Sequence, residues 1–211
     1  QSLFAFDAEA DAYLVALADG QVLMIEASEV TRTPLTTIDK TRSVCELTFD
    51  ASPACLVTDD MALLKQTIVR GRAVQAADTL GAAQYMLDQA VAYSLERKQF
   101  NRVVGSFQAV KHMCAEMASQ LEPSRAFVWY AGHAFDEVTA DAAATACHAK
   151  AHLAEVGQFV AKTSTEVHGG MGFTDLLGLH YWFKRIGFNR QLLGSPEAVR
   201  HEAAVLQGLC E

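Results

Sequence analysis

The chain has 211 residues, of which 51% are hydrophobic and only 4 are proline, so it can form a sizeable core and long helices. Its net charge is −8 and no segment gathers Lys and Arg, which argues against a nucleic-acid partner because binding phosphates needs grouped cations. The 5 cysteines form no CxxC pair and no apolar run reaches about 18 residues, which favours a cytoplasmic chain with free thiols and no membrane span.

Residues 1–58 are predicted to form strands. Three stretches alternate or are rich in strand-forming residues: Ala12–Leu17, Gln21–Ile25 and Ser43–Phe49. The pair Asp19-Gly20 is typical of a tight hairpin turn. Pro34 and Pro53 mark turns or strand edges because proline cannot donate to a ladder. So few strands need a covering layer, and the chain does not begin with Met, so we expect this region to be the end of a larger β-domain.

From residue 59 onward the pattern is helical. Apolar residues at helical spacing predict helices from Asp59 or Asp60 to about Arg97, from Phe107 to about Glu137, from Ala142 to about Val167, from Leu179 to about Leu192, and from Ser195-Pro196 onward. Ser106 is predicted to cap the second helix, and Pro123 to kink or break it. The pair Gly169-Gly170 is predicted to end the third.

These elements predict a mainly α protein. Long helices joined by short loops favour an antiparallel four-helix bundle in residues 59–211, preceded by the partial β-domain in residues 1–58. A coiled coil or a helical repeat is the alternative, but the sequence sustains no heptad and no internal period.

The first segment with possible chemistry is Glu96-Arg97-Lys98-Gln99-Phe100, at the end of the first long helix. A basic pair beside an amide and an aromatic ring could hold a pyrophosphate through charge-assisted hydrogen bonds. Taken alone, the segment is explained better as a charged last turn that balances the helix dipole.

The second segment is Glu166 to Gly172, read EVHGGMG, at the end of the third long helix. Three glycines in four positions let a backbone approach a ligand closely and expose its N–H groups. A simple helix stop followed by a turn is the alternative. The cluster does not follow a strand, so it is not the phosphate loop of a parallel-sheet dinucleotide fold.

Together, RKQF followed by Phe107-Gln108 and a long helix ending in EVHGGMGFT resemble the acyl-CoA dehydrogenase family over about residues 60–210. The resemblance implies a C-terminal four-helix domain, FAD as cofactor, and oxidation of the α,β bond of an acyl-CoA thioester. It also implies a dimer or tetramer with itself or with a similar subunit, because neighbouring chains share each flavin site. The FAD contacts that it implies are Arg97, Lys98, Gln99, Phe100, Phe107, Gln108, Glu166, Val167, His168, Gly169 and Gly170.

The chain departs from this family at the catalytic base, a glutamate that removes the substrate α-proton. The two positions that match the family's glutamates are Leu193, before Gly194-Ser195, and Gly71 in the first long helix. Neither residue can accept a proton. Glu197 is the one weak candidate, although a carboxylate there also suits the first turn of the last helix.

Two further departures concern the cofactor. Glu166 replaces the usual glutamine and Asn101 the usual glycine. A carboxylate cannot donate as an amide does, and it would repel a pyrophosphate.

The remaining candidates have ordinary interpretations. Cys147, His148 and His152 could present a metal-binding face, but they lack an HExxH pattern and we expect no metal. The aromatic group Phe127, Trp129, Tyr130 and Phe135 is expected in the core or at an interface. The group Tyr181, Trp182 and Phe183, beside Lys184-Arg185, is expected to form a subunit contact or to line a pocket.

Three hypotheses follow. The chain is a subunit of a hetero-oligomeric acyl-CoA dehydrogenase whose partner supplies the base. The resemblance to such enzymes implies a bulky acyl group, such as a steroid side chain. Alternatively, it is part of a homo-oligomeric enzyme that uses Glu197 or a residue outside this sequence. Third, it is a non-catalytic interaction subunit that keeps only the helical scaffold.

Overall fold

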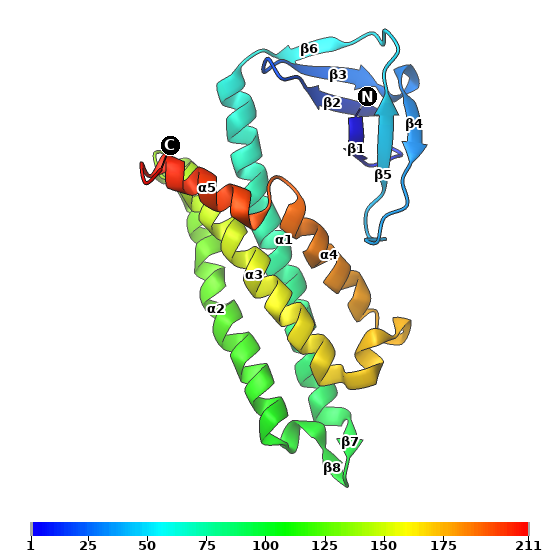
Figure 1. Ribbon diagram of the computed structural model, residues 1–211, viewed down its shortest axis with the longest axis vertical. Coiled ribbons are helices and arrows are strands. Elements are labelled where there is room, and N and C mark those ends of the chain that lie inside the picture. The colour runs from blue at the N-terminus through cyan, green and yellow to red at the C-terminus, as the bar shows by residue number, and fades with distance from the viewer. Residues whose placement is uncertain (1, 211) are drawn as a thin grey trace. The chain divides into compact units, whose positions relative to one another are not determined.

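The computed structural model describes residues 2–210. These divide into two compact units, with the division between Ile68 and Val69. The first unit contains two three-stranded antiparallel sheets, ordered β1-β5-β4 and β2-β3-β6 (Figure 1). The strands are β1 Ser2–Phe6, β2 Ala12–Ala16, β3 Val22–Glu26, β4 Thr31–Pro34, β5 Val44–Thr48 and β6 Cys55–Thr58.

The predicted hairpin is present, with Ala16 opposite Val22 and Gly20 at φ 95°. A small core joins the two sheets through Tyr13 of β2 and Cys45 and Leu47 of β5. Three strands, β1, β4 and β6, were not predicted. β4 carries only exposed residues and ends at Pro34, on the edge of its sheet, so no alternation of apolar and polar residues marks it.

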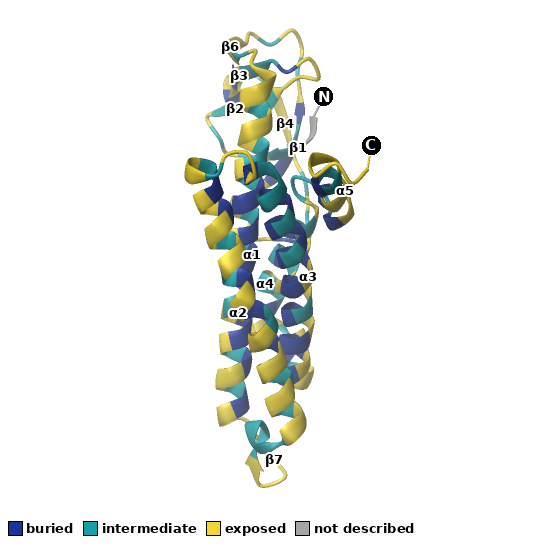
Figure 2. Ribbon diagram, turned by 90° about the vertical axis from the view of Figure 1, so that its left-hand side faces the viewer, coloured by how far each residue is buried: buried dark blue, intermediate teal, exposed yellow. Residues whose placement is uncertain are grey.

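The second unit is the predicted antiparallel helical bundle. Its helices are α1 Met61–Glu96, which begins in the first unit, α2 Gln108–Glu137, α3 Ala142–His168, α4 Leu179–Gln191 and α5 Pro196–Leu206. Successive long helices run in opposite directions (Figure 1). Buried residues lie on the sides of α1, α2 and α3 that face one another (Figure 2).

α3 lies at the centre of the bundle and packs against α2, α4 and α5. Its alanines and Gly157 allow this, because a Cβ added at Gly157 would lie 2.6 Å from Cγ2 of Thr79 on α1. The core also contains Met86 from α1, Met117 from α2 and Leu153 from α3, all fully buried. An alanine-rich helix surrounded by larger side chains therefore lets four helices approach closely.

Helix boundaries follow the sequence with two exceptions. Ser106 does not cap α2: it lies in the 3-10 turn η2 (Val104–Ser106), and its hydroxyl donates to the Val103 carbonyl at 2.7 Å. Pro123 does not break α2, because buried residues on both sides of it, Leu121 and Ser124 among them, keep the helix against the core.

Two predicted helix ends are confirmed. Ser195 caps α5 by accepting the Ala198 N–H at 3.3 Å, and Gly169 ends α3 at φ 58°.

The expected helix caps are partly observed. Asp60 accepts the N–H of Ala62 at 2.8 Å and so caps α1. Asp141 precedes α3 but makes no side-chain capping bond. No helix within residues 2–210 combines the length and apolar character that crossing a membrane would require.

Candidate functional site

The two segments singled out in the sequence meet in one pocket. Its volume is about 440 Å³, and it lies where the end of α1 meets the end of α3. The residues that line it are Tyr93, Arg97, Gln99, Val104, Val167, His168, Gly169, Gly170 and Met171. Residues about 70 positions apart in the sequence thus form a single cavity within one chain.

A short hairpin sets the position of the Arg97 segment. After α1 ends at Glu96, β7 (Lys98–Gln99) pairs with β8 (Arg102–Val103). The two turn residues, Phe100 and Asn101, have φ values of 52° and 61°. Asn adopts such values readily, so Asn101 in place of the family's glycine is compatible with the turn.

The Arg97 side chain is available to a ligand. Within residues 2–210 its guanidinium makes no ion pair and no hydrogen bond, whereas its backbone carbonyl accepts the Val104 N–H at 2.7 Å. The backbone is therefore fixed while the cation remains free to face the pocket. A guanidinium in this situation suits a phosphate or carboxylate.

Gly169 and Gly170, just after α3, line part of the pocket without side chains. A Cβ built at Gly169 or Gly170 has no neighbour within 4 Å in the described part of the chain. Crowding therefore does not explain why glycine stands at these positions. Both residues line the pocket and both are exposed. Their missing side chains therefore leave room for something that approaches the backbone from outside.

His168 and Tyr93 form the floor of the pocket. His168 is buried, its Nδ1 lies 2.7 Å from the Ser164 carbonyl oxygen, and its ring lies 4.6 Å from that of Tyr93. Burial lowers the pKa of His168, although the backbone carbonyls of Ser164 and Gln89 oppose that shift. His168 is thus neutral near pH 7 and held in a fixed orientation. It therefore serves as an uncharged part of the pocket lining and not as a cation that binds an anion.

The other residues expected at the site lie outside the pocket lining. Phe100 and Phe107 contact each other beside the hairpin, with ring centroids 6.1 Å apart, and Lys98, Gln108 and Glu166 are exposed. The pocket also contains Tyr93, Val104 and Met171, which sequence reasoning did not include. Tyr93 could have been found, since it lies one helical turn before Arg97, whose N–H donates to the Tyr93 carbonyl at 2.9 Å.

Gly71 and Leu193, the two positions at which the resemblance predicts the family's base, are neighbours. A Cβ added at Gly71 would lie 2.7 Å from Cδ1 of Leu193, so the leucine occupies the space that a side chain on α1 would enter. Leu193 has φ 58°, an uncommon value for a bulky residue. Its carbonyl accepts a 3.0 Å hydrogen bond from Nε of Arg72.

Arg72 connects this turn to the bundle. Its guanidinium binds both carboxylate oxygens of Glu202 at 2.7 and 2.8 Å, and Nη1 lies 3.3 Å from Sγ of Cys147. The hydrogen bonds from Arg72 lower the pKa of Glu202, while burial raises the pKa of the Cys147 thiol despite Arg72. The turn at Leu193 is therefore held by a buried arginine whose charge is neutralised by a carboxylate.

The surroundings of Glu197 give it a structural role at the start of α5. It is exposed in the first turn of α5, and Oε1 lies 3.2 Å from Nη2 of Arg190. Its pKa is lowered, mainly by a backbone hydrogen bond at the helix start and by the Ser195 hydroxyl. The charged form that a base requires is present, but it is already engaged in capping the helix.

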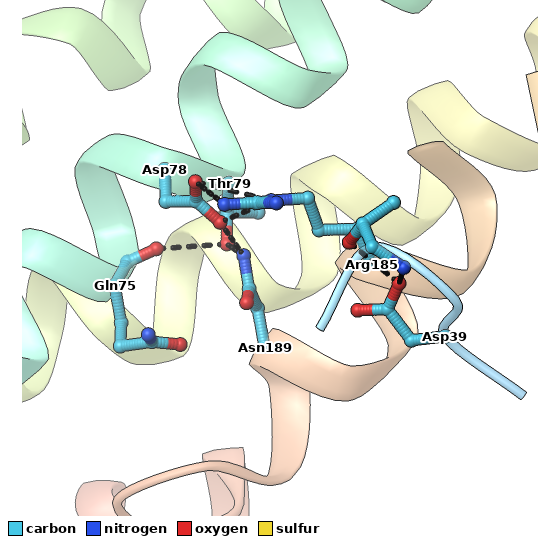
Figure 3. A network of polar contacts seen from close by, with 7 residues as sticks. Asp39, Gln75, Asp78, Thr79, Arg185 and Asn189 are labelled. Carbon is cyan, nitrogen blue, oxygen red and sulfur yellow. Dashed lines mark hydrogen bonds and ion pairs between the residues drawn. The ribbon is translucent and has the colours of Figure 1, made fainter. Parts of the chain in front are cut away.

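The network in Figure 3 joins α1 to α4. Asp78 accepts hydrogen bonds from Nε and Nη2 of Arg185 at 3.0 and 2.7 Å and from Nδ2 of Asn189. Arg185 therefore serves an ion pair between helices. Trp182 packs against the core beside Tyr85, with ring centroids 4.7 Å apart.

The alternative metal-binding face on α3 is not formed. Nε2 of His152 lies 3.0 Å from the Ser124 hydroxyl and its ring stacks on Phe127, while Cys147 is buried against Arg72. No group of three or more metal-ligating side chains occurs among residues 2–210. Of the nearby aromatic residues, Phe135 packs against the core, whereas Trp129 is 70% exposed.

The comparisons with known proteins agree with this architecture. A family model described as the acyl-CoA dehydrogenase C-terminal domain matches residues 61–204. The chain is 32% identical over 179 residues to acyl-CoA dehydrogenase IpdE2 from Mycolicibacterium smegmatis, a match that covers 85% of this chain and 53% of that protein. It is 34% identical over 170 residues to IpdE2 from Mycobacterium tuberculosis, covering 79% of this chain and 48% of that protein.

A solved structure described as a variant of the Tcur3481–Tcur3483 steroid ACAD superposes with a TM-score of 0.82 at 28% identity, covering 93% of this chain and 54% of that one. The chain spans about half the length of the curated relatives that it matches. The chain therefore belongs to the acyl-CoA dehydrogenase family, whose C-terminal helical domain it carries.

Proposed function

We propose that this chain forms part of an FAD-dependent acyl-CoA dehydrogenase, to which it contributes a flavin-binding pocket but no catalytic base. The observation that carries the proposal is the shared cavity, which Arg97 and Gln99 line together with Gly169 and Gly170. Each segment alone has an ordinary structural explanation, but their meeting around an open cavity does not follow from helix capping.

The residues present fit the phosphate-bearing part of FAD. The Arg97 guanidinium and the Gln99 amide can donate to pyrophosphate oxygens, and the two glycines leave room for the chain of phosphates to pass. Val104, Val167 and Met171 supply apolar contact. When bound, FAD accepts the hydride that leaves the β-carbon of an acyl-CoA thioester.

A companion chain supplies the carboxylate that removes the α-proton. The support is that Gly71 and Leu193 carry no acid–base group and pack against each other, and that Glu197 is already paired with Arg190. A similar subunit, or a second copy of this chain joined to further residues, would complete the enzyme as a dimer or tetramer. One similar structure is described by two names joined as a steroid ACAD, which favours a paired subunit and a bulky, steroid-like acyl group.

Flavin retention tests the pocket. We expect the full-length protein, co-expressed with its companion subunit, to purify with visible flavin absorbance, and Arg97→Gln to lose most of it. Arg70→Gln is the matched control, because Arg70 lies over the Phe135 ring and does not line the pocket. An assembly that keeps its flavin in Arg97→Gln, or that never binds flavin at any subunit ratio, would refute the proposal.

A further inference from the structure

The hairpin beside the pocket contains a cation over an aromatic ring. Cζ of Arg102, on β8, lies 3.8 Å from the centroid of the Phe107 ring, and Phe100 meets the same ring edge-on at 6.1 Å. Phe107 comes directly before α2, so it belongs to the bundle rather than to the hairpin. The contact therefore ties the far strand of the hairpin to the start of α2.

This tie acts on a turn with a constrained backbone. Phe100 adopts φ 52°, which costs free energy for a bulky residue. Phe100 is 86% exposed, so burial of its side chain contributes little to holding the turn. The contacts of Arg102 and Phe107 therefore have to be among the interactions that keep the hairpin in place.

The same hairpin determines where Arg97 points. The Val104 N–H, just after β8, donates to the Arg97 carbonyl at 2.7 Å. Gly105 lies against the last turns of α1, where a Cβ would come within 2.8 Å of the Ser94 carbonyl oxygen. A displacement of β8 would thus be transmitted to the backbone of Arg97 and to Gln99, which pairs with Arg102 across the hairpin.

We propose that Arg102 and Phe107 are positioning residues for the flavin pocket, an inference that rests on the proposed function. Arg97 and Arg102 have different roles in this proposal. Arg97 lines the pocket with a guanidinium that is unpaired among residues 2–210, whereas the guanidinium of Arg102 lies on a ring outside the lining. Arg102 orients the hairpin that presents Arg97 and Gln99, and its own charge is not needed at the phosphates.

A double-mutant cycle on the full-length assembly tests this proposal, with FAD titrated into the flavin-free protein. We expect Arg102→Gln to raise the Kd for FAD about 2- to 5-fold, the range that an exposed cation–π contact supplies. Arg102→Lys should restore nearly the original Kd, because it keeps a cation over the ring. In a Phe107→Leu background, Arg102→Gln should add no further loss.

The thermal midpoint of the flavin-free assembly separates positioning from general destabilisation. It should be the same in Arg102→Gln and in the control Arg70→Gln, which disrupts a cation–π contact away from the pocket. An unchanged Kd in Arg102→Gln, or an equal loss with Phe107 and with Leu at that position, overturns the inference alone. An unchanged Kd in Arg97→Gln would instead remove the flavin site itself, and with it the proposed function.

Discussion

The side chain of Leu193 fills the space beside Gly71, with its Cδ1 2.7 Å from where a Cβ on Gly71 would stand. The two residues lie 122 positions apart in the sequence, one on α1 and one in the turn before α5. From the resemblance, we expect both to correspond to positions at which acyl-CoA dehydrogenases carry a glutamate. In this chain the two positions are therefore coupled by size as well as lacking a base.

This coupling predicts how α1 tolerates a longer side chain. Gly71→Glu should lower the free energy of unfolding by about 1–3 kcal/mol, because Leu193 has to move. Adding Leu193→Ala should recover most of that loss. Gly81→Glu is the control on the same helix, since no atom lies within 4 Å of its Cβ position, and it should change stability by less than about 1 kcal/mol.

Thermal or denaturant unfolding measures the effect in five proteins: the original, Gly71→Glu, Leu193→Ala, the double variant and Gly81→Glu. Strictly additive effects of the substitutions at positions 71 and 193 would show that the leucine does not occupy the space in solution.

The ion pair between Arg72 and Glu202 predicts a loss of stability in acid. Arg72 lowers the pKa of Glu202 in the folded chain, so the pair stabilises above the ordinary glutamate pKa of about 4.5. That contribution should disappear as the pH falls through the lower, folded-state pKa. Glu202→Gln should be about 1–3 kcal/mol less stable near neutral pH, because it leaves the buried guanidinium without a charged partner.

Unfolding curves of both proteins at several pH values check this prediction. The difference between them should shrink below pH 4.5. A difference that stays constant across the acid range would mean that the carboxylate is not charged in the folded pair.

The burial of Lys150 leads us to predict that folding stability changes at alkaline pH. Its side chain is buried, and Nζ donates to the carbonyl oxygens of Asn189 at 2.6 Å and Arg190 at 3.3 Å. Burial lowers its pKa to about 8, so between that value and the ordinary 10.5 the unfolded chain binds more protons than the folded chain. Stability should therefore rise with pH across this interval in the original protein.

Lys150→Met removes the titrating group and should not show that rise. Chemical unfolding at intervals between pH 7 and pH 10 compares the two proteins. Parallel curves would indicate that Lys150 keeps an ordinary pKa in the folded state.

We predict that a substitution at Gly170 lowers flavin binding without lowering folding stability. A Cβ added at this position meets no atom within 4 Å among the residues that the structure describes, and it would project from a residue that lines the pocket. Gly170→Val should therefore unfold at nearly the same temperature as the original assembly but retain less flavin. The ratio of flavin to protein in each purified assembly is the measurement, and full retention in Gly170→Val would place the flavin elsewhere.

The sequence predicted the helical unit well because its helices have strong signals. Local sequence patterns are enough to predict two of these features: the apolar stripe of Met113, Met117 and Leu121, and the helix end at Gly169. The strands β4 and β6 escaped prediction because they are short and mostly exposed. The prediction that Ser106 caps α2 was wrong, because a serine can donate to a nearby carbonyl as well as cap a helix.

The pocket could be predicted only in part. Arg97 and the glycine corner stand out as motifs, whereas Val104 and Met171 are ordinary apolar residues that become part of the lining through the fold. The contact between Gly71 and Leu193 was beyond prediction, since no local pattern tells which side chain will fill the space beside a helical glycine.

The central claim is that this chain helps to bind a flavin but does not supply the base. Turnover of an acyl-CoA thioester by the full-length protein, purified alone with FAD and again after assembly with its companion, tests it most directly. We predict no dehydrogenation by the protein alone and dehydrogenation by the assembly. Full turnover by the protein alone, abolished by Glu197→Gln, would contradict the account.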